Sequence, residues 1–383
     1  MKLVDLALVS PKKVFDEIVG LLATISHETL YAESNIIHNA VSAKATNKNS
    51  ALNYFFFFLQ ILAAELNLAK RLNERPEYYQ FYLQNILVLF IEMGNSIQRT
   101  MAKSKKEHEY PLASKLGSLL TVLSTLLEHD DFNPHLSPSG ETVALFRNFW
   151  FHCVLFGFVT ESIWIREWHA CMLQIAKKTP VLVLESNTNY LESDLEHNSV
   201  LCNSSVAEHG LGPMRQKLNN YLPTLAYDIK NFSFAQIVFA LSVYHVEMMR
   251  SRKGDCSHIL HYFMNDGVNT STLGNCLETI ADRVSQAFIK DASGKAQGQN
   301  LDENLRDQVA ALLKLCCHKR EKVHAVAIKT VERIVLSFPQ VFTDGSLVQL
   351  LLELVQLSWL SCEAEYRDEV RRVKRKRKAN PAL

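Results

Sequence analysis

The sequence predicts an all-α protein, an α-solenoid of stacked antiparallel helix pairs. Apolar residues recur at helical spacing along most of the chain, and no alternating strand pattern of useful length occurs. The 383 residues include only 13 Gly and 10 Pro, too few for the frequent tight turns of sandwiches and barrels. No repeat of fixed period is detectable, so the repeats are expected to be degenerate ones of the HEAT or armadillo type.

The expected helices follow one another along nearly the whole chain. Leu116, Leu120 and Leu123 illustrate the spacing of a one-sided apolar face. In the helix expected over 233–251, apolar residues cover opposite sides, so this helix should lie between neighbours on several sides. The expected spans are 14–41, 50–73, 77–101, 111–128, 141–159, 162–177, 213–222, 233–251, 255–265, 271–290, 301–317, 320–337 and 346–364.

Polar or Gly- and Pro-containing stretches separate these helices and set the expected domain organisation. The predicted surface loops or insertions are 102–110, 129–140, 185–210 and 291–300. The glycines in Gly210–Leu211–Gly212 are interpreted as part of the third loop, because they lack the remaining glycine of a nucleotide-binding motif. We expect one solenoid domain over residues 1–365, with a weak break around 185–212, followed by a disordered basic tail over 366–383.

The net charge of +1 conceals an uneven distribution of charge. Seven basic residues and no acidic one lie between 371 and 378: Arg371, Arg372, Lys374, Arg375, Lys376, Arg377 and Lys378. The remaining 34 basic and 40 acidic residues give the body a net charge of −6, which argues against a nucleic-acid-binding surface. The basic block is compatible with a solvated tail, a contact with anionic lipids, or a nuclear localisation signal.

Cysteine usage and hydropathy indicate a cytosolic, soluble protein. The eight cysteines show no paired C-x-x-C spacing and are expected to be reduced, buried thiols. The longest apolar stretch, Tyr54–Ala64, is shorter than the roughly 20 residues that span a membrane, so no spanning helix is expected. Asp5 interrupts the apolar N-terminal run, so a secretory signal is not expected either.

No catalytic, cofactor-binding or metal-binding residue can be assigned from the sequence. Motifs for phosphate loops, kinase catalytic loops and serine hydrolases are absent from the chain. The candidate metal ligands are Cys256, His258, His261 and Cys276. Their spacing lacks the two closely spaced ligand pairs that are usual for zinc. They are interpreted as ordinary helix residues.

The stretch Leu145–Phe158 (LFRNFWFHCVLFGF) is the most distinctive segment of the chain. It predicts a nearly all-round apolar helix, followed by a second helix that carries Trp164 and Trp168. Arg147, the one charged residue, is expected to cap carbonyl groups or to pair with a carboxylate such as Glu161 or Glu167. The tryptophans, Trp150 included, are expected to pack between helices and not to form a ligand-binding aromatic cage.

This stretch, together with further motifs in order, resembles the N-terminal solenoid of type III alpha phosphatidylinositol 4-kinases. The further motifs are Ala51–Tyr54, Ala64–Ala69, Arg75–Glu77, Leu87–Phe90 with Met93–Gly94, Ile175–Pro180, Leu241–Arg250, Ile280–Val284 and Phe338–Pro339. The resemblance covers roughly Ala51 to Glu363. It implies that the family-signature packing residues are Phe146, Arg147, Phe149, Trp150, Trp164 and Trp168.

The resemblance implies a non-catalytic scaffold segment of a lipid kinase that makes phosphatidylinositol 4-phosphate at the plasma membrane. ATP and Mg²⁺ would belong to the family's kinase domain, which these residues do not match. The implied partners are a tetratricopeptide-type scaffold and a membrane-anchored helical-repeat protein, with a homodimer in the full-length family. The chain would then be cytoplasmic and only peripherally membrane-associated. A stand-alone helical-repeat adaptor in trafficking or nuclear import is the alternative function. The basic tail does not resemble the family, and a truncated, spliced or mis-predicted kinase gene product would account for it.

Overall fold

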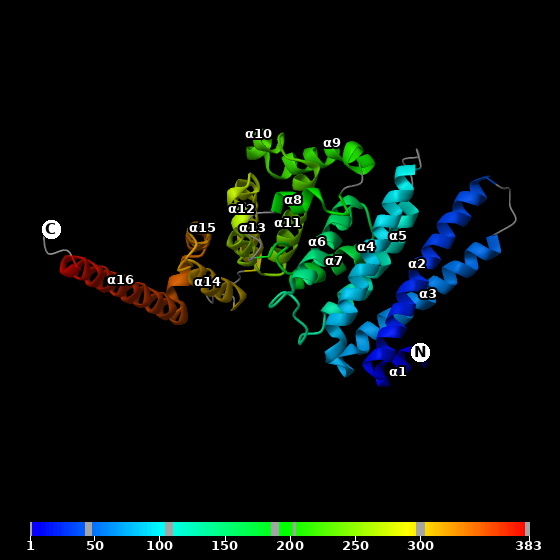
Figure 1. The fold of residues 1–383 in the computed structure, drawn as a ribbon, viewed down its shortest axis with the longest axis horizontal. Coiled ribbons are helices and arrows are strands. Elements are labelled where there is room, and N and C mark those ends of the chain that lie inside the picture. Colours follow the sequence, from blue (N-terminus) through cyan, green and yellow to red (C-terminus); the bar gives the residue numbers. More distant parts are fainter. Residues whose placement is uncertain are drawn as a thin grey trace. The chain divides into compact units, whose positions relative to one another are not determined.

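The computed structural model of the chain describes residues 2–42, 48–103, 110–184, 191–201, 204–295 and 303–379. All regular secondary structure in these ranges is helical, and the helices pack against one another as stacked pairs (Figure 1). The predicted all-α solenoid is therefore confirmed. The chain forms two compact units, Met1–Lys253 with Asn265–Ile280, and Gly254–Met264 with Ala281–Leu383.

The first unit contains the helices of the N-terminal two thirds of the chain. They are α1 (Lys2–Val9), α2 (Lys12–Ser42), α3 (Lys48–Arg71), η1 (Leu72–Glu74), η2 (Pro76–Tyr78), α4 (Tyr79–Lys103), α5 (Tyr110–Leu127), α6 (Gly140–Leu155), α7 (Arg166–Lys178), α8 (Leu191–Glu196), α9 (Ser204–Tyr221), η3 (Pro223–Leu225), α10 (Ala226–Ile229), α11 (Phe234–Arg252), α12 (Asp266–Thr270) and the start of α13 (Leu273–Lys295). Consecutive helices pair, α2 with α3 and α4 with α5, and each pair packs on the next: α4 contacts α6, and α5 contacts α7.

Helix α11 of the first unit is surrounded by neighbouring helices. It begins at a capping box, in which the Ser233 hydroxyl accepts from the Gln236 backbone N–H and the Gln236 side chain accepts from the Ser233 N–H. It then contacts α6, α7, α8 and α9, and residues on all its sides are buried. The expectation that this helix lies between several neighbours is confirmed, because apolar residues around a whole helix can be buried only in this way.

The second unit is smaller and contains η4 (His258–Met264), the remainder of α13, α14 (Glu303–Leu315), α15 (Glu321–Ser337), η5 (Pro339–Thr343) and α16 (Gly345–Ala379). Its core lies where α15 packs on α14 and η4, with Val309, Leu312 and Val326 buried there. Asp282 accepts hydrogen bonds from Lys329 (3.0 Å) and Arg333 (2.7 Å), and these ion pairs lower the pKa of its carboxyl group against the opposing effect of burial.

The polar segment before α11 is more ordered than the sequence predicted. Its described part holds α8, whose Leu191 and Leu195 are buried, and α9 runs through Gly210–Leu211–Gly212 and Pro213. The prediction of a loop at these glycines was wrong. Burial of Met214 and Leu218 on one side of α9 outweighs the weak helix propensity of glycine and proline. The chain passes between the two units at Lys253–Gly254, Met264–Asn265 and Ile280–Ala281, which differs from the break expected around 185–212.

Helix α16 departs from the sequence-based expectations in two ways. It continues to Ala379 and so includes most of the segment expected to be a disordered tail; residues after Tyr366 lack Gly and are rich in the good helix formers Arg and Lys. In addition, Gly345–Arg367 is long and apolar enough, by length and composition, to cross a membrane. This segment contains no long uninterrupted apolar run, because Gln349, Glu353 and Gln356 divide it, although its average hydropathy stays high.

The cysteines of the described ranges are all free thiols, but they are not all buried as expected. Cys153, Cys256 and Cys276 are buried, and burial raises the pKa of the Cys276 thiol to about 12. Cys317 and Cys362, in contrast, are exposed. Cys202 lies outside the described residues.

Candidate functional site

Helix α6 carries the distinctive stretch and lies in the interior of the first unit. It begins at Ser139, whose hydroxyl accepts from the Thr142 backbone N–H and so satisfies one of the free donors of the first turn. Phe146 and Phe149 are fully buried, and the Phe149 ring packs 4.6 Å from Phe90 of α4 between centroids. This helix is therefore a core element and exposes little surface to a ligand.

Trp150 has no exposed surface and is held by a polar contact as well as by packing. Its indole Nε1 donates to Thr179 Oγ1 at 3.1 Å, and that hydroxyl in turn donates to the Ile175 carbonyl at 2.8 Å. The ring of Phe149 meets the indole edge-on, with centroids 5.8 Å apart. Trp150 thus joins α6 to the C-terminal end of α7.

Trp164 and Trp168 form a second aromatic group with Phe158, beside α6. Trp164 stacks on Phe158 at 5.1 Å and donates its indole N–H to the Phe156 carbonyl at 3.0 Å. Trp168 packs so closely on α5 that a Cβ at Gly117 would lie 2.4 Å from its ring. Both tryptophans are half-buried between helices, and the three rings do not surround an open cage.

The Ile175–Pro180 segment, quoted above only as a motif, connects several helices of the first unit. The guanidinium of Arg250 in α11 is almost completely buried and donates to the carbonyls of Lys177 and Thr179. Its Nε lies 3.2 Å from Glu247 Oε2, so the charge is balanced within the same helix. The ammonium of Lys178 donates to the carbonyls of His129 and Phe132 in the preceding loop.

Together with Thr179, these contacts tie α6, α11 and the 129–132 loop to the end of α7. Sequence reasoning missed these polar roles. The available signal was a Glu and an Arg three residues apart in a helix that is apolar on all sides, since a buried charge needs a partner.

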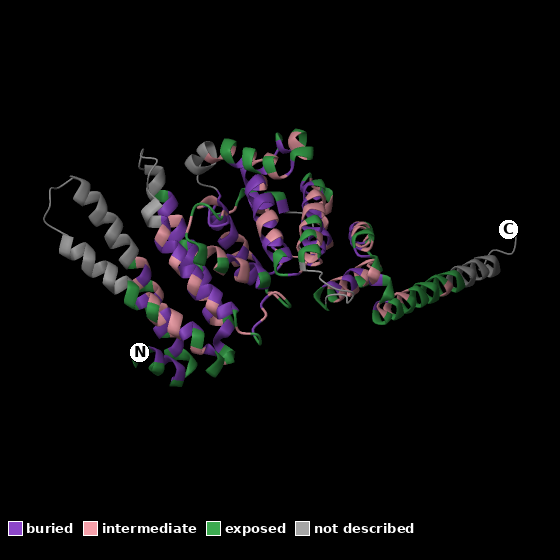
Figure 2. Ribbon diagram, turned by 180° about the vertical axis from the view of Figure 1, so that it is seen from behind, coloured by how far each residue is buried: buried purple, intermediate pink, exposed green. Residues whose placement is uncertain are grey.

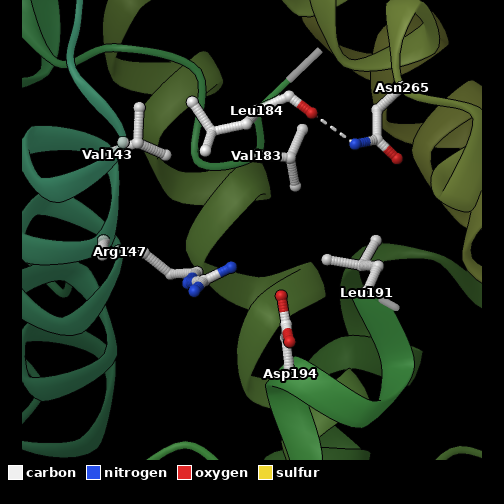
Figure 3. A pocket seen from close by; sticks show the side chains of 9 residues that line it. Val143, Arg147, Val183, Leu184, Leu191, Asp194 and Asn265 are labelled. Carbon is white, nitrogen blue, oxygen red and sulfur yellow. Dashed lines mark hydrogen bonds between the residues drawn. The ribbon is translucent and has the colours of Figure 1, made fainter. Parts of the chain in front are cut away.

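A small cavity of about 40 Å³ lies beside α6 and contains the only charged residue of the distinctive stretch (Figure 3). Arg147 points toward Asp194 of α8, and Asn265 donates to the Leu184 carbonyl at the opposite side. Burial lowers the pKa of Arg147, and the charge of Asp194 partly offsets this effect. The cavity has room for a water or two and is far smaller than the roughly 300 Å³ of a metabolite site.

The expected pairing of Arg147 with Glu161 was wrong, because Glu161 has other partners. Glu161 accepts a 2.6 Å hydrogen bond from Arg252 and lies 3.2 Å from His169, which together lower the pKa of its carboxyl group. The carboxylate that faces Arg147 is Asp194, which belongs to the segment expected to be a loop. The position of Asp194 depends on α8, a helix that the apolar spacing did not predict.

Ser257, whose residue type suggests catalysis, has a structural role. Ser257, His261 and Asp307 line one open groove of the second unit. The Ser257 hydroxyl, however, donates to Asp255 Oδ1 at 3.1 Å, and the same oxygen accepts from the backbone N–H groups of Ser257 and His258. Asp255 thus caps the start of η4, and Ser257 is not arranged as a nucleophile.

No cluster of three or more His, Cys, Asp or Glu side chains suited to a metal ion occurs among the residues that the structure describes. His258 and His261 lie on one 3-10 helix with ring centroids 5.6 Å apart. The basic block 371–378 belongs to α16, but its side chains lie outside the described part of the chain.

These observations define a class of protein: a helical solenoid segment whose distinctive residues build its interior and whose described part shows no catalytic arrangement. The sequence profile of the family described as PI4-kinase N-terminal region matches residues 2–162 and 159–373. The chain therefore belongs to this family, and the match comprises only its non-catalytic N-terminal region.

Two fungal relatives extend this finding. The chain is 22% identical over 299 residues to phosphatidylinositol 4-kinase STT4 of Saccharomyces cerevisiae, covering 77% of this chain and 16% of the yeast protein. It is 26% identical over 227 residues to phosphatidylinositol 4-kinase stt4 of Schizosaccharomyces pombe, covering 59% of this chain and 12% of that protein. The chain thus spans less than a fifth of the length of either relative.

Proposed function

We propose that this chain is a non-catalytic scaffold segment of a phosphatidylinositol 4-kinase and contributes protein–protein contacts to phosphatidylinositol 4-phosphate synthesis at the plasma membrane. The observation that carries this proposal is the family match over residues 2–373. The buried contacts of Arg250, Lys178 and Trp150 support it, because they stiffen a stack of helices whose outer surfaces stay available to partners.

The proposed partners are a tetratricopeptide-type scaffold protein and a membrane-anchored helical-repeat protein. A solenoid suits such partners because adjacent helices present long surfaces, whereas the cavity beside α6 is too small for a metabolite. The proposed location is the cytoplasm, with peripheral association at the plasma membrane through these partners.

Capture experiments test the scaffold role directly. The immobilised tetratricopeptide-type scaffold should retain the purified chain, and the soluble chain should compete with a full-length kinase for the same scaffold. Deletion of 371–378 serves as a matched control and should leave capture unchanged, because the proposed contacts are made by the helical body. A folded chain that neither binds the scaffold nor competes for it would refute the proposal.

An activity assay tests the non-catalytic part of the proposal. The purified chain, given ATP, Mg²⁺ and phosphatidylinositol vesicles, should form no phosphatidylinositol 4-phosphate, because phosphoryl transfer needs phosphate-binding and metal-binding groups. Turnover that persists after contaminating kinases are removed would contradict the assignment.

A stand-alone adaptor in trafficking or nuclear import is the second candidate function. The observation that favours it is the basic block 371–378, a composition also found in nuclear localisation signals. Imaging of the tagged chain separates the two: nuclear accumulation that disappears on deletion of the block supports the adaptor, and cytoplasmic or peripheral staining supports the scaffold segment.

A further inference from the structure

Helix α16 presents an apolar surface that nothing in the described part of the chain covers. Six residues spaced alternately four and three apart form what we call the α16 stripe: Val348, Leu352, Val355, Trp359, Cys362 and Tyr366. At 100° per residue they fall within an arc of about 80°. All six are exposed, Leu352 by 64% and Trp359 by 72% (Figure 2).

The stripe is a separate surface from the side of α16 that packs within the second unit. The helix contacts α14 and η5 near its start, where Leu347 is buried. Leu350, Leu351 and Leu354, on that same side, are half-buried. Beyond these residues the helix is largely uncovered, and only 6% of its most apolar window is buried.

The opposite flank of the helix is mainly polar, which makes α16 amphipathic. Gln349, Glu353 and Gln356 project at 80–140° from the centre of the stripe, by about 100° per residue. Leu357 and Leu360 are the apolar exceptions on that side. A two-sided helix of this kind lies along a membrane interface, whereas one that crosses the bilayer would bury Glu353 in hydrocarbon.

Charge indicates which surface would accept this helix. Helix α16 continues without interruption to Ala379, and its sequence places seven Lys and Arg residues between 371 and 378. Basic clusters on an amphipathic helix are attracted to anionic phospholipids. None of the acidic residues of Gly345–Arg367 lies in the stripe. Trp359 and Tyr366, which do, are residue types enriched at the boundary between headgroups and acyl chains.

We propose that α16 is a membrane-contact helix for bilayers that contain anionic phospholipid. The α16 stripe enters the acyl boundary, and the basic block 371–378 meets the headgroups. Each signal alone is weak, and stable attachment of a peripheral protein takes two of them. A second copy of the chain is a poorer occupant, because parallel pairing would bring two basic blocks together, whereas an anionic surface neutralises them. This inference goes beyond the proposed function, in which partners alone bring the chain to the membrane.

Vesicle flotation with the full chain tests the proposal. Binding to phosphatidylcholine vesicles that contain phosphatidylserine should exceed binding to phosphatidylcholine alone by about tenfold, and it should weaken as salt rises. Leu352→Glu with Val355→Glu should reduce binding about tenfold or more, because it places charge in the stripe. The matched control, Gln349→Glu with Gln356→Glu, adds the same charge on the polar flank and should cost no more than about threefold.

A measurement on the unaltered chain locates the contact independently of those variants. Vesicles of brominated phosphatidylserine should quench a fraction of the tryptophan fluorescence, since Trp359 is far more exposed than the buried Trp150. The variant Trp359→Phe should lose that quenched fraction and keep the rest.

Three results would overturn the proposal. Equal losses from the stripe variant and its control would show that charge alone is responsible. Equal binding to both kinds of vesicle would remove the role of anionic lipid. A chain that ignores vesicles but sediments as a dimer, with only the stripe variant monomeric, would assign the stripe to self-association. Capture by the tetratricopeptide-type scaffold should be unaffected by the stripe variant, so failure here is distinguishable from failure of the scaffold proposal.

Discussion

Helices α6 and α16 are both rich in leucine, phenylalanine or tryptophan, yet they occupy opposite environments. Trp150 of α6 has no exposed surface, and its indole N–H is bonded to Thr179. Trp359 of α16 is 72% exposed. The difference teaches that apolar composition indicates a surface to be covered, while the tertiary neighbours decide whether it is covered.

The polar groups near the two helices differ in the same way. Around α6 the charged groups of Arg250 and Lys178 are buried and donate to backbone carbonyls. Along α16 an ion pair joins Arg367 to Glu363, four residues earlier in the helix, and both side chains are largely exposed. Buried polar contacts fix one arrangement of helices, whereas exposed pairs of this kind contribute little to it.

The largest effect should come from Trp150→Ala. Loss of a fully buried indole and its bond to Thr179 should lower the free energy of unfolding by about 3–5 kcal/mol. Chemical denaturation followed by circular dichroism measures this change. An unchanged midpoint would show that the environment of α6 is not a close-packed core.

Arg250→Ala should be nearly as damaging, by about 3–4 kcal/mol, because it leaves Glu247 buried without its cation and frees two carbonyls of the Ile175–Pro180 segment. Arg252→Ala is the matched control two residues on. Its pair with Glu161 is exposed, so it should cost less than about 1 kcal/mol. Similar losses from both variants would contradict the structural role of Arg250.

A pH titration should show a smaller effect that belongs to the α6 region. Burial lowers the pKa of His152 from 6.5 to about 3, with the Gln98 amide 3.2 Å from its Nδ1. Below pH 6.5 the unfolded chain binds a proton at this site that the folded chain does not, so stability is lost as pH falls toward 3. At pH 5 the loss is about 2 kcal/mol for this group.

The variant His152→Gln isolates that contribution. His245 is half-buried, and desolvation lowers its pKa to about 3 as well, so about half of the histidine-dependent loss should remain in the variant. Glu65 acts in the opposite direction, because burial raises its pKa to about 7 and the folded chain holds its proton more tightly. The quantity to measure is therefore the change in the free energy of unfolding from pH 8 to pH 5, compared between the unaltered chain and His152→Gln. An equal change in both would contradict a neutral, buried His152.

The smallest effect should come from Trp359→Ala in α16. The exposed indole has little packing to lose, so the free energy of unfolding should change by no more than about 0.5 kcal/mol. Denaturation beside Trp150→Ala makes the comparison within one protein. A loss as large as that of Trp150→Ala would mean that α16 is covered in solution.

The sequence was sufficient to predict most helices, because the spacing of their apolar residues does not depend on which neighbours they pack against. The span expected over 233–251 corresponds to α11 (Phe234–Arg252), and that over 320–337 to α15 (Glu321–Ser337). The sequence was not sufficient where tertiary burial decides: α8 forms in a polar stretch because Leu191 and Leu195 reach the core. The segment expected as a helix over 255–265 is the 3-10 helix η4, capped by Asp255.

The contacts of the candidate site were less predictable than the fold. Packing of the tryptophans could be expected from their helical setting. The need for glycine at position 94 could not, because it arises from the His152 ring, which would lie 2.8 Å from a Cβ there. The contacts of Arg250 with Lys177 and Thr179 join residues more than 70 positions apart. Local spacing carries no information about such pairs, which depend on how α7 and α11 cross.

The capping of α7 by Arg250 has a consequence for local opening. The last turn of a helix normally frays first, because its carbonyls lack partners within the helix. Here two carbonyls at that end accept hydrogen bonds from Arg250 in the last turn of α11, so fraying would leave a buried guanidinium without these partners. Amide hydrogens at the end of α7 should therefore exchange with solvent as slowly as those of α11, in one cooperative unit.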